Sequence, residues 1–350
     1  MVTPPQHPYV GRAQSAFWKS AVADLTPPQI GPLYSPKFDI GGMKVATAGS
    51  CFAQHITRAL RQAGFPFVDV EPAPSGLARE NWPKFGYGMY SARYGNVYTS
   101  RQMLQLLQRA TGEFVPGMSA WAHQDGVVDP FRPVIEPEPF ESIAEVERNR
   151  NEHLKRVIAL FETADLLVFT LGLTETWSAA ADGAVFPLAP GVAGGQYDPA
   201  EYNFINLTFA DVIADIEQLF TRAREINPDM HFMLTVSPVP LAATATEEHV
   251  VVATSHSKAV LRAACGELAA GHAYVDYFPS YEMIASPVMR GMFYGPRGRD
   301  VTQEGVDHVM QQFFAAHGIV PSERTLDTPP SEQVDPECEE ELLAAAAQSR

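Results

Sequence analysis

The chain alternates between two kinds of hydrophobic pattern. Four short, mostly apolar runs are predicted as buried strands: 44–49, 165–171, 231–236 and 273–277, of which 165–171 shows the continuous pattern of a strand covered on both faces. Five stretches between them carry apolar residues at helical spacing: 51–63, about 145–162, 209–226, 257–270 and about 302–317. Strands that alternate with helices predict an α/β fold with a doubly wound parallel sheet, and ligands of such sheets bind outside the carboxyl ends of the strands.

Three stretches interrupt this alternation: 66–100, 113–140 and 178–207. They are rich in proline, glycine and aromatic residues, so we expect loops or a small cap over the sheet edge, where function is often carried. The predicted organisation has three parts. They are a proline-rich extended arm over 1–40, an α/β domain over 41–320 with insertions at about 66–140 and 178–207, and an acidic tail over 321–350, expected to be disordered or loosely helical.

Composition narrows the possible partners. The 350 residues are 46% hydrophobic, enough for a full core, and 25 basic against 41 acidic residues give a net charge of −16. That charge repels phosphate backbones and anionic membrane surfaces, so neither nucleic acid nor membrane is expected as a partner. The sequence shows no signal-peptide pattern and no apolar stretch of about 20 residues. We therefore predict a cytoplasmic protein, of open oligomeric state.

Metal and cofactor chemistry have little support. Cys51, Cys265 and Cys338 are widely spaced and are expected to be free thiols, with Cys51 buried as a small hydrophobic residue rather than reactive. The ten histidines form no His-x-x-x-His spacing, and no Cys-x-x-Cys occurs, so no metal is predicted. The glycine-rich 190–195 lacks the Lys-Ser/Thr of a phosphate loop. No cofactor is predicted.

Gly49 and Ser50 stand where the first strand turns into a helix. A small residue allows the tight turn, the serine hydroxyl is presented at the carboxyl edge of the sheet, and the helix N-terminus supplies amides for an oxyanion. Ser50 is thus the candidate nucleophile. The alternative is that Ser50 serves only as the N-cap of the helix, a position that favours serine.

The residues around Ser50 resemble the motif of a known family. Gly49-Ser50-Cys51-Phe52-Ala53 spells the motif of the GSCFA family, which the sequence resembles over about 40–318, and that family is grouped by resemblance with the SGNH (GDSL-like) esterases. The resemblance implies a flavodoxin-like, SGNH-type sheet with Ser50 as nucleophile. Five further matches follow in order: Tyr94-Gly-Asn96-Val-Tyr98-Thr99, Leu171-Gly-Leu-Thr-Glu-Thr-Trp177, Thr235-Val-Ser-Pro-Val-Pro240, Ser257-Lys258 and Tyr277-Phe-Pro-Ser-Tyr-Glu282.

The resemblance also suggests partners for Ser50. Thr174 stands where GDSL esterases have the oxyanion-hole asparagine, and Asn96 is the alternative donor, unless it is only a turn residue. Asp300 stands near the place of the Asp-x-x-His ending, whose histidine is missing. A serine needs a base, so we consider His249 as the base with Asp300 orienting its ring.

Other histidines remain open as the base. They are His308, which a packed or solvated helix position explains better, and His256; His55 is expected on the helix surface.

The sequence therefore supports three functions. The first is a serine esterase or deacylase acting on an O-acylated small molecule or glycan through an acyl-enzyme at Ser50, and an O-acyltransferase would use the same intermediate. The second is a catalytically degenerate protein that binds a carbohydrate or peptide, favoured by the missing histidine. The third is a scaffold role. Aromatic residues in the insertions could stack on sugar rings or form the core of a cap: Trp82, Tyr87, Tyr90, Tyr94, Trp121 and Trp177.

Overall fold

The centre of the protein is a parallel sheet of four strands in the order β1-β4-β8-β9. The computed structural model describes residues 7–320 and Leu342. The strands lie within the four predicted apolar runs, which confirms those predictions. They are β1 (Val45–Gly49), β4 (Leu166–Leu171), β8 (His231–Val236) and β9 (Val275–Tyr277).

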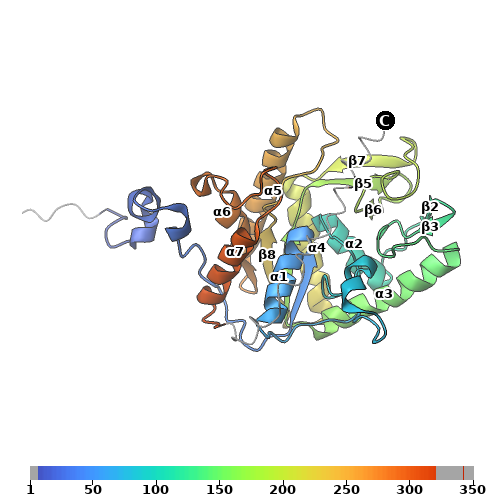
Figure 1. Ribbon diagram of the computed structural model, residues 1–350, viewed down its shortest axis with the longest axis horizontal. Helices are drawn as coiled ribbons and strands as arrows, with labels where there is room; N and C mark the ends of the chain where they lie inside the picture. Colours follow the sequence, from blue (N-terminus) through green and yellow to red (C-terminus); the bar gives the residue numbers. More distant parts are fainter. Residues whose placement is uncertain (1–6, 321–341, 343–350) are drawn as a thin grey trace, which may run out of the picture.

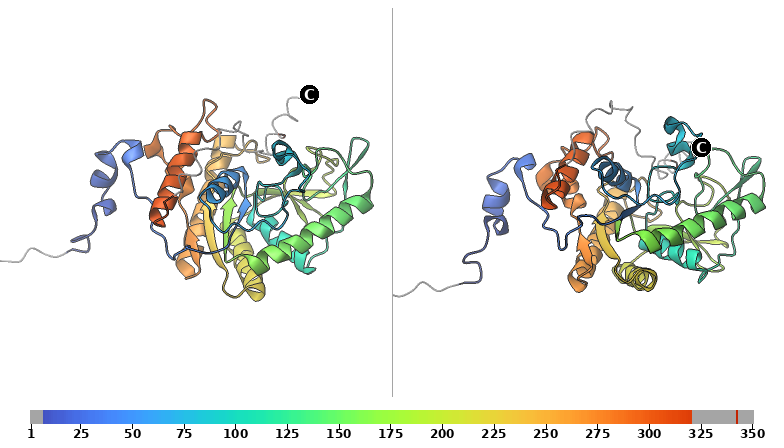
Figure 2. Two further views of the ribbon diagram at one scale, coloured as in Figure 1. Left: turned by 60° about the horizontal axis from the view of Figure 1, so that its bottom comes forward. Right: turned by 90° about the horizontal axis from the view of Figure 1, so that it is seen from below.

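Helices pack on both faces of this sheet (Figures 1 and 2). Because neighbouring residues of a strand point to opposite faces, Leu167 joins one core with α2, α3, α4 and α5, while Leu166 joins the other with α1, α6 and α7. The helices are α1 (Cys51–Gln62), α2 (Ser100–Thr111), α3 (Ile143–Thr163), α4 (Phe209–Ile226), α5 (Val250–Gly271), α6 (Ser280–Ala285) and α7 (Gln303–Ala316).

The stretches expected to form loops or a small cap contain strands of two small antiparallel sheets, and α2 lies between the first two of these stretches. A hairpin and a three-stranded sheet in the order β6-β5-β7 lie at one end of the molecule (Figure 1). Trp121, Phe186 and Tyr202 form a common aromatic core there. The strands are β2 (Trp121–His123), β3 (Gly126–Val128), β5 (Glu175–Ala179), β6 (Val185–Phe186) and β7 (Tyr202–Asn206).

A buried charge network supports the loop that precedes α2. The Asp129 carboxylate, fully buried, accepts from Arg132 at 3.0 Å and from Arg150 at 2.7 Å. Arg132 also donates to the carbonyl of Arg93 at 3.2 Å, and the Arg93 amide donates to Glu71 at 2.6 Å. These contacts fix the backbone just before Tyr94-Gly-Asn96.

His153 of α3 closes this network and gives it a pH dependence. Its Nδ1 lies 2.7 Å from Glu71 Oε2, and its side chain is 2% exposed. Burial, followed by the nearby Arg132, lowers the pKa of His153 to about 4. A histidine whose folded pKa is depressed stabilises the fold above its unfolded pKa of about 6.5, and this contribution is lost as the pH falls towards 4.

We therefore expect the free energy of unfolding to fall by about 2 kcal/mol between pH 7 and pH 5 through His153 alone. Urea unfolding of wild type and His153→Gln at both pH values measures this difference. The variant should lose that part of the pH dependence. An unchanged difference between the two pH values in His153→Gln would contradict the assignment.

The N-terminal arm leaves the body of the protein beyond α7 (Figure 1). It is not fully extended, since it contains the short turns η1 (Gln14–Ala16), η2 (Lys19–Ala23) and η3 (Pro27–Gln29). Ile30, Tyr34 and Ile40 pack into the same core as α7. Within the described ranges, no helix combines the length and the apolar character needed to cross a bilayer. The tail predicted over 321–350 and Cys338 fall outside these ranges, apart from Leu342.

Candidate functional site

Ser50 occupies the N-cap position of α1, but its side chain does not act as a cap. Its backbone is extended, with φ −72° and ψ 177°, and no side-chain capping bond forms. The residue is 2% exposed, and its Oγ has no hydrogen-bond partner among residues 7–320. Because buried hydroxyls are normally hydrogen-bonded, an orphaned one calls for an explanation, which the capping alternative does not supply.

Gly49 makes the turn possible by letting β1 approach β4 closely. Its φ is +144°, and a Cβ at this position would lie 2.7 Å from Thr170 Cβ. The Ser50 amide then donates to the Thr170 carbonyl at 3.1 Å. The Ser50 amide, which the sequence offered as an oxyanion donor, is therefore engaged with β4.

A small cavity adjoins Ser50 at the carboxyl ends of β1, β4 and β8. Its volume is about 10 Å³, close to the lower limit for a single water molecule. In this conformation no substrate group fits beside the hydroxyl. The residues that line it are Ser50, Cys51, Tyr98, Gly172, Leu173, Ser237, Val239, Pro240 and Leu241.

Gly172, the first residue after β4, lies directly against Ser50. A Cβ on Gly172 would be 3.0 Å from Ser50 Cβ and 3.1 Å from the Tyr98 ring. Two neighbouring residues of α5 hold this turn from behind. Lys258 Nζ donates to the Gly172 carbonyl at 2.5 Å, and Ser257 Oγ accepts from the Thr174 amide at 3.0 Å.

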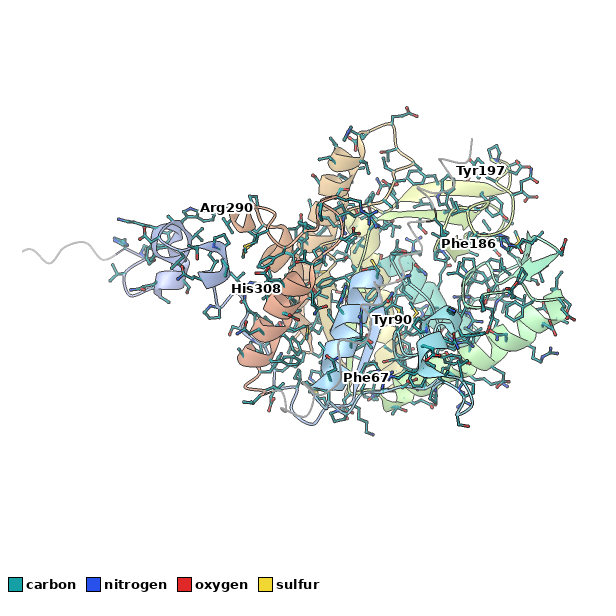
Figure 3. The ribbon with its side chains drawn as sticks, in the orientation of Figure 1. Phe67, Tyr90, Phe186, Tyr197, Arg290 and His308 are labelled. Atoms are coloured by element: carbon teal, nitrogen blue, oxygen red, sulfur yellow. The ribbon has the colours of Figure 1, made fainter. Side chains whose placement is uncertain are left out.

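Asn96 is connected to Ser50 through a tyrosine. The Tyr90 hydroxyl lies 2.5 Å from Asn96 Oδ1 and 3.1 Å from the Ser50 carbonyl, and Asn96 is 1% exposed. The Asn96 carbonyl accepts from Gln102 Nε2 at 2.8 Å. Because Oδ1 is the acceptor for Tyr90, the orientation of the Asn96 side-chain amide is fixed. Figure 3 shows Tyr90 next to α1.

Thr174 is used within the protein rather than at the cavity. Its hydroxyl donates to Asn206 Oδ1 at 2.6 Å, and its amide donates to Ser257. It is fully buried and does not line the cavity beside Ser50. Its single hydroxyl proton is thus used in the hydrogen bond to Asn206 of β7. Thr174 is therefore not placed as the oxyanion donor that the resemblance suggested.

The structure does not bring His249 and Asp300 together with Ser50. His249 is exposed at the N-cap of α5, where its Nδ1 accepts from the Val251 amide at 3.2 Å. The Asp300 carboxylate pairs with Arg297 at 2.9 Å and is 45% exposed. In the part of the chain that the structure describes, no histidine hydrogen-bonds the Ser50 hydroxyl.

The other candidate histidines also have local explanations. His308 stacks on Phe293 from α7, where burial lowers its pKa (Figure 3), and His256 is exposed on α5. His55 is not on an open surface as expected, because it lines a groove of about 540 Å³ between α1 and α7. Burial and then Arg58 lower the pKa of His55 to about 3.

Cys51 was expected to be buried, and the aromatic residues were expected either to stack on sugar rings or to form the core of a cap. Cys51 is buried, as expected, but it lines the same cavity as Ser50. Tyr90, Tyr94 and Trp121 are each at most 3% exposed and belong to the core. Of the aromatic residues proposed for sugar stacking, Trp177 lines a second cavity of about 150 Å³.

That second cavity adjoins the first. Both are lined by Leu173 and Leu241, which form a small apolar cluster with Tyr98 and Ala253. The walls of the larger cavity are mostly apolar, and Glu175 lines it while bonding to Thr244 at 2.6 Å. Two leucines thus separate Ser50 from the nearest larger space.

Sequence reasoning assigned no role to Tyr98, Ser237 or Lys258. Ser237 immediately follows β8, is fully buried, and accepts from the Val239 amide at 3.3 Å. All three lie within the short matches that carried the resemblance, and the position of Ser237 after a buried strand was the available signal.

Comparisons with known proteins agree with the resemblance at the level of the family. A comparison with curated proteins gives no match. The family model described as the GSCFA family matches residues 44–313, which include the Ser50 turn, all four strands of the central sheet and Lys258. Since this match covers well over half of the chain, the protein belongs to the GSCFA family.

Proposed function

We propose that the protein is a serine esterase or deacylase that forms an acyl-enzyme at Ser50. The observation that carries this proposal is the Ser50 hydroxyl, which is buried, has no hydrogen-bond partner within residues 7–320, and borders a cavity at the carboxyl edge of the sheet. An orphaned polar group held at a helix N-terminus costs stability, and catalysis is a reason to retain it.

The proposed oxyanion site uses donors other than those first expected. The positive end of the helix dipole of α1 favours negative charge next to Ser50. Asn96 Nδ2 supplies a side-chain donor in this proposal, because Tyr90 fixes the orientation of the amide. Such preorganised donors stabilise a developing oxyanion without reorganisation.

The cavity beyond Leu173 and Leu241 is the proposed site for the acyl group. After the alcohol leaves, the acyl group stays bound to Ser50, so it requires space inside the protein. A volume of about 150 Å³ is similar to that of a cavity that takes up benzene, which corresponds to roughly six carbon atoms. The apolar walls and the Glu175 carboxylate favour a neutral acyl group, carried by a small-molecule or glycan alcohol.

The finer description of the fold belongs to the same proposal. Helices on both faces of the parallel sheet are compatible with a doubly wound, SGNH-type arrangement. By resemblance, such esterases carry their serine at the end of the first strand. Ser50 has this position at the end of β1. A cytoplasmic location and a carbohydrate or small-molecule ester as substrate remain predictions.

Labelling with a fluorophosphonate probe tests the proposal. We expect slow covalent labelling of the wild type, mapped to Ser50 by mass spectrometry of the labelled peptide, and none in Ser50→Ala. Ser237→Ala is the matched control, because Ser237 lines the same cavity but has its hydroxyl engaged with the Val239 amide. A folded wild type that stays unlabelled would contradict the proposal and favour a binding protein.

Two alternatives use the same residues. The cavity beside Ser50 has room for only about one water molecule, and exclusion of water favours transfer of the acyl group to an alcohol, as in an O-acyltransferase. The absence of a histidine bonded to Ser50, among the residues described, favours a degenerate protein that binds a carbohydrate or peptide. Labelling separates the degenerate protein from the other two, and product analysis with an added acceptor alcohol separates these.

A further inference from the structure

Lys258 is one of the largest fully buried side chains of the protein. Lysine is among the residues that are least often fully buried, because taking the ammonium group out of water is costly. Its position on α5 directs the amine to the carboxyl edge of the sheet, where Nζ donates to the Gly172 carbonyl at 2.5 Å. A buried amine at this edge calls for a reason in the chemistry of the site.

Gly172 connects Lys258 to the proposed nucleophile. The same residue whose carbonyl accepts from Lys258 lies against Ser50, at 3.0 Å between Ser50 Cβ and the position of an added Cβ. Gly172 also lines the cavity that has room for about one water molecule. The Lys258 amine and the Ser50 side chain therefore both lie next to Gly172.

No described histidine is placed to act as the general base for Ser50. No described histidine hydrogen-bonds Ser50, and His249 and Asp300 are engaged elsewhere. We propose that Lys258 is the general base for Ser50, taking the place of the histidine in a Ser-His-Asp triad. This inference rests on the proposed function and adds the group that makes Ser50 reactive. Serine–lysine pairs are a known variant of the triad chemistry.

The proposed step balances as follows. In the proposed step Lys258 enters as a neutral amine, whose N–H donates to Gly172 while its lone pair accepts the Ser50 proton through an intervening water. Oγ forms a bond to the acyl carbon, and the carbonyl electron pair moves onto oxygen. When the oxyanion collapses, the bond to the alcohol oxygen breaks, and the Lys258 ammonium returns its proton to the departing alkoxide. Water then repeats the sequence and releases the acid.

Chemical rescue tests this role. In Lys258→Ala we expect the rate of fluorophosphonate labelling of Ser50 to fall by about 10²- to 10⁴-fold. Small primary amines added to the buffer should restore labelling, and rescue should increase with pH as more of each amine becomes neutral. Lys258→Arg keeps a cation that can donate a hydrogen bond but cannot act as a base, so it should stay slow with or without amine.

Ser257→Ala is the matched structural control. It removes a hydrogen bond to the same turn from the neighbouring residue of α5 but leaves the amine in place. If Lys258 only clamps the turn, Ser257→Ala should slow labelling comparably, and amines should rescue neither variant. That result would overturn the inference, as would unchanged labelling in Lys258→Arg.

The pH dependence of labelling gives a second readout, in wild type and in folded Lys258→Met. The labelling rate of the wild type should rise with pH through a single deprotonation, and this rise should be absent in Lys258→Met. A wild type without any labelling would instead refute the proposed function itself. A labelled wild type whose pH profile is unchanged in Lys258→Met would refute only the role of Lys258.

Discussion

Replacing Gly49 by alanine should prevent the protein from folding stably. The backbone at Gly49 has a φ of +144°, which side chains other than glycine rarely adopt, and the added methyl group would collide with Thr170 of β4. β1 is paired with β4 along its whole length, and β4 is paired with β8 on its other side, so the two strands cannot easily move apart. We expect a loss of more than about 4 kcal/mol in the free energy of unfolding, measured by urea or thermal unfolding.

Gly112→Ala provides the control for the intrinsic cost of a left-handed backbone. Gly112 ends α2 with φ +78°, and an added Cβ would meet no atom within 4 Å. This variant should lose only about 1 kcal/mol. If Gly49→Ala were no less stable than Gly112→Ala, the close approach of β1 to β4 would not be what requires glycine before Ser50.

Asp129→Asn should cause the largest loss of stability among changes to charged residues. The Asp129 carboxylate is fully buried and neutralises Arg132 and Arg150, and these arginines together with Arg109 hold its pKa well below the usual range against the effect of burial. An amide of the same size would leave buried arginine charge uncompensated. We expect a loss of about 3–5 kcal/mol in the free energy of unfolding.

The control for Asp129→Asn is a pair on the surface. Glu152 and Lys155 form an exposed ion pair on α3, and Glu152→Gln should leave the unfolding transition unchanged. Because Arg132 also holds the Arg93 carbonyl, Asp129→Asn should loosen the loop that carries Asn96. Equal stability of the two variants in urea would show that the network is not the support we describe.

The sequence predicts the central sheet well because its two inner strands, β4 and β8, are mostly apolar. The runs at 165–171 and 231–236 are buried on both faces and flanked by long amphipathic helices, so their pattern is local. The three-stranded sheet was missed because its core joins Trp121, Phe186 and Tyr202 from distant segments. These three residues are too far apart in the sequence for their contact to be seen in any short segment.

The candidate site also has a part that the local sequence predicts and a part that it does not. The strand-to-helix turn at Gly49 and Ser50 can be predicted, because it depends on neighbouring residues. The partners of Ser50 depend on where other strands and helices end. Lys258 lies far along the chain, and only the packing of α5 against β8 and β9 brings its amine to Gly172. The position of Thr174 in its motif suggested an oxyanion donor, yet its hydroxyl donates to Asn206 on β7.

The apolar cluster of Tyr98, Leu173, Leu241 and Ala253 has a consequence for the time course of any reaction at Ser50. While it is closed, Ser50 and the larger cavity are separate, so every substrate must wait for the same opening of the segment that carries Leu241. When such a motion is slower than bond making, it limits turnover. Esters with good and poor leaving groups would then be consumed at similar maximal rates. The selectivity for esters would depend on which acyl groups stabilise the open form of this apolar cluster.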